Sequence, residues 1–177
     1  MNTRILVLGG ARSGKSSHAE AIAATAGEVD YLATSENRPD DPEWQARIAL
    51  HRARRPRGWA TIETINVAAE LVRDTDRMLL VDCLTVWLTR QMDAAGVWTA
   101  EPDCDEILRT AVDGLVKAIG ACRRPVIMVS NEVGQGIVPL DAGTRRFRDE
   151  MGILNAKVAA AVNRVDFCIA GIPQRLK

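Results

Sequence analysis

The chain has 177 residues, of which 47% are hydrophobic and 26% are charged, and its 23 basic residues are balanced by 23 acidic ones. This length fits one domain with a substantial core, expected to span residues 1–177, and is short for two domains. The balanced charge argues against a nucleic-acid-binding protein, and the short apolar runs argue against a signal peptide or a membrane span.

Short apolar runs bounded by Gly, Asp or Pro predict five buried strands, in chain order at residues 5–9, 31–34, 78–82, 126–130 and 167–171. Segments with apolar residues three and four positions apart, or with a helix start signal, predict helices between them, at 15–25, 42–54, 104–121 and 144–164. Because the strands are apolar throughout rather than alternating, both faces of their sheet are expected to be covered. This indicates a mainly parallel α/β fold with flanking helices.

The most informative motif is GGARSGKS, which matches the phosphate-loop pattern GxxxxGK[ST] between a predicted strand and a predicted helix. Gly9 and Gly14 allow backbone conformations that turn N–H groups toward a phosphate, and the positive end of the following helix helps to hold it. Lys15 is expected to reach the β- and γ-phosphates of a nucleoside triphosphate. The sequence therefore predicts a single-domain P-loop NTPase-like (RecA-like) fold, with nucleotide contacts at Gly9, Gly10, Ala11, Arg12, Ser13, Gly14, Lys15 and Ser16.

A metal ion is expected beside this loop. The Ser16 hydroxyl is suited to ligate Mg²⁺, and Asp82 ends the buried strand at 78–82, where it would hold Mg²⁺ directly or through water. The four cysteines are widely spaced and form no CxxC pair, which favours reduced thiols in a cytoplasmic protein over a zinc site. The GxGxxG fingerprint of dinucleotide-binding proteins is absent, so NAD is not expected.

Two other classes of P-loop protein fit the sequence less well. A GTPase switch normally carries an NKxD-like guanine signature, which is absent, and DAAG at 93–96 follows a helix-like segment rather than a strand. A nucleic-acid-dependent ATPase would need a second basic or aromatic surface, and four Trp, one Tyr and two Phe offer little capacity for base stacking. A small enzyme that transfers a phosphoryl or nucleotidyl group fits better.

The segment RIALHRARRPRGW, residues 47–59, gathers five arginines around one of the two histidines. Periodicity alone is compatible with a solvated helix and turn, and a phosphate-handling site is the alternative. A neutral imidazole is a competent nucleophile toward phosphorus, and neighbouring guanidinium groups can stabilise the charge that develops. The other histidine, His18, lies in the helix after the phosphate loop and is expected to be a helix-face residue.

The glycine-rich segment SNEVGQGIVP follows the fourth predicted strand, where ligands gather in open α/β sheets. It is compatible with an ordered loop at a catalytic edge or with a simple connection between a strand and a helix. Arg145, Arg146 and Arg148 begin the next predicted helix, where positive charge opposes the helix dipole. An anion or a partner acid is therefore expected nearby.

Six segments occur in an order that resembles one enzyme family: GGARSGKS, YLATSE, RIALHRARRPRGWATIE, VDCLTVWLT, VSNEVGQGIVP and RRFRDEMGILNAKVAAAVNRVDFCIAGIP. From residue 4 to its C-terminus the chain is similar to the bifunctional adenosylcobinamide kinase / adenosylcobinamide-phosphate guanylyltransferase family of cobalamin biosynthesis. HRxxRPxxWxTIE and SNEVGxGIVP are the specific parts of this resemblance, because many unrelated proteins share the phosphate loop.

The resemblance implies two reactions. ATP or GTP phosphorylates the aminopropanol hydroxyl of adenosylcobinamide, and GTP then donates GMP to adenosylcobinamide phosphate, giving adenosyl-GDP-cobinamide and pyrophosphate. In the family the second reaction passes through a GMP-histidine intermediate, and the matching histidine here is His51. The resemblance also implies Mg²⁺ bound with the nucleotide and a homotrimeric assembly.

The resemblance implies catalytic roles for His51 and Lys15. Family nucleotide contacts outside the phosphate loop fall on the matching positions Thr34, Ser35, Glu36, Arg52, Ala53, Arg54, Arg55, Glu63 and Asp82. Two alternatives stay open: a kinase-only P-loop enzyme that acts on another small molecule, and a nucleotide-dependent switch.

Overall fold

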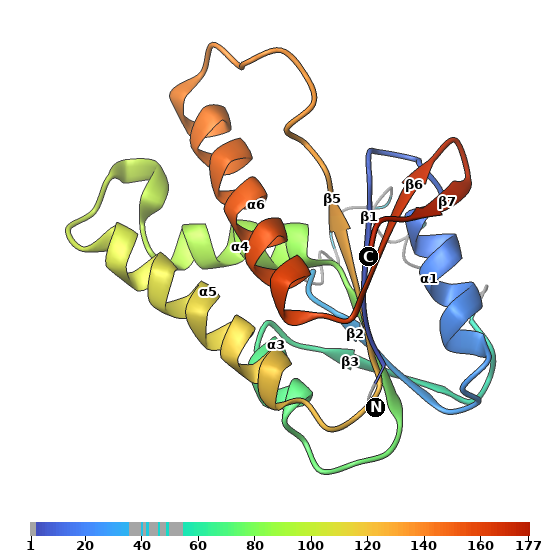
Figure 1. The fold of residues 1–177 in the computed structure, drawn as a ribbon. Coiled ribbons are helices and arrows are strands. Elements are labelled where there is room, and N and C mark those ends of the chain that lie inside the picture. The colour runs from blue at the N-terminus through green and yellow to red at the C-terminus, as the bar shows by residue number, and fades with distance from the viewer. Residues whose placement is uncertain (1–2, 36–39, 41, 43–45, 47–48, 50–54) are drawn as a thin grey trace.

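The computed structural model describes residues 3–35, 40, 42, 46, 49 and 55–177 (Figure 1). Its strands are β1 (Arg4–Gly9), β2 (Val29–Ala33), β3 (Trp59–Glu63), β4 (Met78–Asp82), β5 (Val126–Asn131), β6 (Arg164–Ile169) and β7 (Ile172–Arg175). Its helices are α1 (Lys15–Ala24), α3 (Val67–Leu71), α4 (Leu84–Ala94), the 3-10 helix η1 (Val97–Thr99), α5 (Cys104–Ala121) and α6 (Ala142–Ala161).

The described strands form one sheet in the order β3-β2-β4-β5-β1-β6-β7. All neighbouring pairs are parallel except β6 and β7, which form an antiparallel hairpin at one edge. This arrangement confirms the predicted mainly parallel α/β fold. It also places β5 between β1, which leads into the phosphate loop, and β4, which ends at Asp82.

Helices cover both faces of the sheet, as the continuous apolar strands predict. In Figure 1, α1 lies on one face, and α3, α4, α5 and α6 lie on the other. Alternate residues of β1 serve the two layers: Ile5 and Val7 pack in the cluster that includes Ala19 of α1, whereas Leu6 and Leu8 pack in the larger cluster under the other helices. Burial on both faces removes apolar side chains from water and is the main stabilising contribution to this fold.

The structure differs from the sequence prediction at the sheet edges and in two helices, α3 and α4, which were not among the predicted ones. β3 and β7 were not predicted, because their side chains are largely exposed and form no apolar run. The predicted helix at 144–164 ends at Ala161, since Val162 has an extended backbone, and the predicted strand at 167–171 begins earlier, at Arg164. The predicted helix at 42–54 lies mostly outside the described residues.

No described helix is long and apolar enough to cross a membrane. The four cysteines, all within the described residues, are unpaired thiols.

A buried ion-pair network joins β2 to two loops at the amino end of the sheet. Asp30 accepts hydrogen bonds from Arg124 Nη2 at 2.5 Å and from Arg77 Nε at 2.6 Å. Arg124 is 1% exposed, and its remaining donors reach the carbonyl oxygens of Arg77 and Glu70. Burial alone would raise the pKa of Asp30, but the two guanidinium groups outweigh it and lower that pKa below its ordinary value.

We expect the Asp30→Asn substitution to lower the free energy of unfolding by about 3–5 kcal/mol, because it leaves the buried Arg124 charge without its partner. The lowered pKa means that the stability from Asp30 is fully present above about pH 4 and is lost as the pH falls below it. Denaturant unfolding of both proteins between pH 3 and pH 7 measures both effects.

The matched control is Asp113→Asn, which removes an exposed ion pair between α5 and Lys157 of α6. That substitution should change the unfolding free energy by less than about 1 kcal/mol. Equal effects of the two substitutions would show that the Asp30 network adds no more than a surface pair.

Candidate functional site

The candidate site lies at the carboxyl edge of the parallel strands, toward which the β5 arrow points in Figure 1. Parallel strands end together at this edge, and ligands of open α/β sheets bind there. Register pairs Gly9 of β1 with Asn131 of β5, and it pairs Ala33 of β2 with Asp82 of β4 and Glu63 of β3. The predicted phosphate loop, Asp82, Thr34 and Glu63 therefore share one edge.

The phosphate loop connects β1 to α1 in the conformation its glycines allow. Gly14 has φ +90° and directly precedes α1, so the loop runs into a helix N-terminus with its free N–H groups. An ideal Cβ on Gly9 would lie 2.3 Å from Ser13 Oγ and 2.7 Å from the Cys168 carbonyl oxygen. Any other residue at this position would therefore clash with these two atoms. Lys15 Nζ donates to the Gly10 carbonyl oxygen at 3.1 Å, so its ammonium lies over the loop.

The remaining loop residues differ in exposure. Ala11 and Arg12 are exposed, Ser13 is buried, and Ser16 is half-buried in the first turn of α1. Arg12 has φ +56°, in the left-handed region that non-glycine residues rarely adopt. The loop thus presents a helix N-terminus, an ammonium group and a hydroxyl to an anion, which is the donor set for a nucleotide phosphate chain.

Asp82 is held in place by Tyr31, a residue that belongs to none of the predicted site motifs. The Tyr31 hydroxyl donates to Asp82 Oδ2 at 2.7 Å. Burial and the nearby Asp82 carboxylate raise the pKa of Tyr31 above its ordinary value, so the phenol keeps the proton it donates. No sequence signal marks this contact, because Tyr31 looks like any other residue of a buried strand.

The oxygen donors at this edge suit Mg²⁺. Ser16 offers a hydroxyl and Asp82 a carboxylate, both hard ligands, and Mg²⁺ commonly uses one or two protein oxygens together with substrate phosphates. Within the described part of the chain there is no cluster of three or more His, Cys, Asp or Glu residues that could form an all-protein metal site. The donor set thus fits a metal ion that binds together with a nucleotide.

Thr34 connects the ends of β2 and β4. Its buried hydroxyl donates to the Cys83 carbonyl oxygen at 2.8 Å and accepts from the Cys83 N–H at 3.1 Å. Arg90 of α4 donates to the Thr34 carbonyl oxygen at 3.4 Å. The Thr34 side chain therefore fixes the backbone beside Asp82, and Ser35 follows it as a half-buried residue. Glu63, at the end of edge strand β3, is exposed.

Arg55 is the predicted site residue of the arginine-rich segment that lies within the described residues. Its guanidinium carbon lies 3.2 Å from the centroid of the Tyr31 ring, and its Nη1 donates to Thr61 Oγ1 at 3.3 Å. Trp59 stacks on the same Tyr31 ring with 6.5 Å between centroids. Since Tyr31 also binds Asp82, one aromatic ring connects Arg55 to the acidic group of the site. The predicted site residues that lie outside the described residues are Glu36, His51, Arg52, Ala53 and Arg54.

The end of β5 and the first residue of the following loop are held by hydrogen bonds to other segments. The Glu132 N–H donates to the Gly9 carbonyl oxygen at 3.1 Å, so the loop begins beside the phosphate loop. The Asn131 N–H donates to Thr85 Oγ1 at 2.9 Å, and Asn155 Nδ2 donates to the Asn131 carbonyl oxygen at 3.0 Å. These contacts fix only the start of the loop, and Ile137 and Leu140 farther along it are almost fully exposed, so both interpretations of the segment stay open.

The arginines at the start of α6 find partners within the protein. Arg145 donates to the Pro139 and Leu140 carbonyl oxygens, and Arg148 donates to the Gly134 carbonyl oxygen. Arg146 pairs with Asp105 and Glu150. The expected partner acid is therefore observed for Arg146, whereas Arg145 and Arg148 bind backbone carbonyl oxygens.

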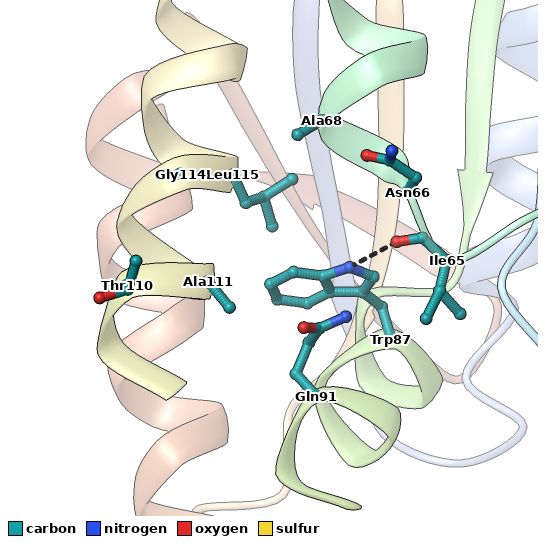
Figure 2. A pocket seen from close by; sticks show the side chains of 9 residues that line it. All are labelled: Ile65, Asn66, Ala68, Trp87, Gln91, Thr110, Ala111, Gly114 and Leu115. Atoms are coloured by element: carbon teal, nitrogen blue, oxygen red, sulfur yellow. Dashed lines mark hydrogen bonds between the residues drawn. The ribbon is translucent and has the colours of Figure 1, made fainter. Parts of the chain in front are cut away.

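A pocket of about 380 Å³ lies between α3, α4 and α5, on the face of the sheet opposite α1 (Figure 2). The Trp87 indole forms one of its walls, and the indole N–H donates to the Ile65 carbonyl oxygen at 3.0 Å. Trp87 is 4% exposed and belongs to the larger core cluster, so it is a core residue. None of the residues that line the pocket belongs to the predicted nucleotide site.

The chain matches the family model described as cobinamide kinase / cobinamide phosphate guanyltransferase over residues 5–176. The bifunctional adenosylcobalamin biosynthesis protein CobP of Pseudomonas aeruginosa is 43% identical to it, over 98% of this chain and 97% of its own length. The proteins named CobU from Escherichia coli K12 and Salmonella typhimurium are 38% and 39% identical, each over 98% of this chain and 99% of its own length.

Among solved structures, the ATPase EscN of the enteropathogenic E. coli type III secretion system is similar, with a TM-score of 0.55 and 16% identity. The match covers 96% of this chain and 43% of the EscN chain, and it shows the fold alone. It confirms the P-loop NTPase-like fold predicted from the sequence.

Proposed function

The chain belongs to the cobinamide kinase / cobinamide phosphate guanyltransferase family, and we propose that it carries both activities on adenosylcobinamide. The observation that supports this most strongly is a complete phosphate loop at the same sheet edge as Asp82, in a chain similar over 98% of its length to relatives named bifunctional. The first activity is phosphorylation by ATP or GTP, and the second is transfer of GMP from GTP.

In the kinase step, the aminopropanol hydroxyl of adenosylcobinamide attacks the γ-phosphorus of ATP or GTP. The new O–P bond forms as the bond to the β-phosphate oxygen breaks, the nucleoside diphosphate leaves, and the hydroxyl proton is released to solvent. Charge develops on the phosphate oxygens during this transfer. The backbone N–H groups of the loop and the Lys15 ammonium are positioned to stabilise that charge.

In the guanylyltransferase step, His51 attacks the α-phosphorus of GTP, an N–P bond forms, and pyrophosphate leaves. A phosphate oxygen of adenosylcobinamide phosphate then attacks the same phosphorus, the N–P bond breaks, and the imidazole is restored. Arg52, Arg54 and Arg55 would offset the charge on the departing pyrophosphate. Arg55 follows His51 by four residues, and its packing on Tyr31 anchors this end of the arginine-rich segment near Asp82.

Mg²⁺ would be held by the Ser16 hydroxyl and the Asp82 carboxylate and, when bound, would offset negative charge on the phosphate oxygens. Tyr31 orients the Asp82 carboxylate for this role through its hydrogen bond to Oδ2. The homotrimeric assembly implied by the resemblance and the cytoplasmic location predicted from the cysteine pattern stay predictions.

The proposed function is tested by incubating the purified chain with adenosylcobinamide and GTP that carries a label on one phosphate. Label on the γ-phosphate should appear in adenosylcobinamide phosphate, and label on the α-phosphate should appear in adenosyl-GDP-cobinamide. Transfer of the γ-label alone would favour the kinase-only alternative. Nucleotide binding without transfer of either label would favour the nucleotide-dependent switch.

Removal of divalent metal with EDTA should abolish both reactions, and added Mg²⁺ should restore them. In Asp82→Asn, the Mg²⁺ concentration that gives half-maximal rate should rise by roughly tenfold, because a neutral amide is a poorer ligand for a hard cation than a carboxylate. Mg²⁺ titrations of initial rate measure this shift, with Asp113→Asn on the exposed surface of α5 as the control. Identical titration curves for the two variants would contradict the metal role of Asp82.

A further inference from the structure

The β6–β7 hairpin at the edge of the sheet has a two-residue turn. Ile169 pairs with Ile172, and the turn residues between them, Ala170 and Gly171, have φ values of +50° and +80°. Positive φ at both positions is typical of a type I′ turn, whose twist matches that of the flanking strands. The turn therefore has a defined geometry that depends on glycine at its second position.

This turn contacts the phosphate loop directly. The Gly171 N–H donates to the Ser13 carbonyl oxygen at 2.9 Å. An ideal Cβ on Gly14 would lie 2.9 Å from Gly171 Cα, so the two backbones approach as closely as glycine permits. A motif in the first residues of the chain is thus supported by a turn near its C-terminus.

The hydrogen bond to Ser13 also orients the next N–H group. The Ser13 carbonyl and the Gly14 N–H belong to one planar peptide unit, and in a trans peptide they point in opposite directions. Fixing the carbonyl toward the hairpin therefore directs the Gly14 N–H away from it. Among the described residues no acceptor is found for this N–H, which leaves it available to a bound anion.

The same hairpin holds the first turn of α1 at a second point. Asp166 of β6 is 1% exposed, and its Oδ2 lies 2.8 Å from His18 Nε2. Arg164 forms an ion pair with the same carboxylate at 2.6 Å, which keeps it charged and fixed. Since His18 comes one helical turn after Lys15, this contact restrains the segment that carries Lys15 and Ser16.

We propose that the β6–β7 hairpin is a positioning element of the nucleotide site, acting on the phosphate loop through Gly171 and on α1 through the His18–Asp166 pair. Backbone donors bind a phosphate well only when they already point at it, and the hairpin supplies that orientation. Gly171, Asp166 and His18 are positioning residues and need not touch the nucleotide. This inference rests on the proposed function, since it concerns the same phosphate site.

Gly171→Ala tests the first contact by straining the turn that carries the Gly171 N–H, and Gly27→Ala is its matched control. Both glycines have φ +80°, and a Cβ on either would meet nothing within 4 Å, so both substitutions carry the same backbone strain. Gly27 lies in the connection between α1 and β2, away from the phosphate loop. The two variants should therefore lose similar thermal stability.

Their nucleotide affinities should differ. Binding of a non-hydrolysable ATP or GTP analogue with Mg²⁺, measured by isothermal titration calorimetry, should weaken about fivefold in Gly171→Ala and stay at the wild-type value in Gly27→Ala. Equal affinities of the two variants, with the wild type binding normally, would overturn this inference alone. A wild-type chain that binds no nucleotide would overturn the proposed function and this inference with it.

A second pair of variants tests the contact to α1 without changing the turn. His18→Gln keeps a side-chain N–H donor for Asp166 and should retain the nucleotide affinity, whereas His18→Ala removes the donor and should weaken it by a similar factor. Retained affinity in both variants, at equal thermal stability, would exclude the His18–Asp166 pair from the positioning element.

Discussion

Substitution of Lys15 by alanine is expected to lower kcat/KM for adenosylcobinamide phosphorylation by roughly 100-fold or more. The Lys15 ammonium lies over the phosphate loop, where its Nζ is 3.1 Å from the Gly10 carbonyl oxygen. Loss of this charge removes a donor that would contact the γ-phosphate in the transition state. Initial rates with γ-labelled nucleotide measure the effect.

Lys117→Ala is the matched control for this prediction, because it removes an exposed lysine from α5 and should leave the kinase rate unchanged. Thermal unfolding of both variants establishes that each is folded. A decrease of less than tenfold in folded Lys15→Ala would contradict the role of Lys15 in phosphoryl transfer.

Substitution of His51 by alanine is expected to separate the two activities. GMP transfer should fall by roughly 10⁴-fold or more, because alanine cannot form the covalent GMP intermediate from which the corrinoid phosphate accepts GMP. Phosphorylation of adenosylcobinamide should continue, since that step needs the phosphate loop and not the imidazole. Both rates are measured on one sample, so the kinase reaction is the internal control for folding.

Parallel loss of both activities in folded His51→Ala would mean that His51 acts in nucleotide binding rather than as the nucleophile. Unchanged GMP transfer would contradict any role of His51 in the reaction. Only the loss of GMP transfer with retained phosphorylation agrees with a GMP-histidine intermediate.

Sequence patterns predicted the central strands of the sheet and missed its edge strands for one physical reason. β1, β4 and β5 are buried on both faces, so their continuous apolar runs are visible in the sequence. The edge strands β3 and β7 carry exposed side chains and leave no such signal. The helix over Cys104–Ala121 was predicted with its observed ends, because its apolar stripe packs against the core.

The candidate site was predictable where it is local in sequence. The phosphate loop is a contiguous motif, and Asp82 can be identified because it ends the apolar run MLLVD. Contacts between distant segments were not predictable: Tyr31 binds Asp82 across 51 residues, and His18 binds Asp166 across 148 residues. The role of Gly171 is of the same kind, since it depends on how a C-terminal turn meets a loop at residue 13.

The most direct measurement is to locate the nucleotide on the wild-type chain. The protein is incubated with Mg²⁺ and GTP labelled at the α-phosphate, in the absence of any corrinoid, then denatured and digested for mapping of the labelled peptide. We predict one acid-labile GMP adduct, carried by His51. An adduct on His18, or no adduct in a preparation that completes GMP transfer, would contradict it.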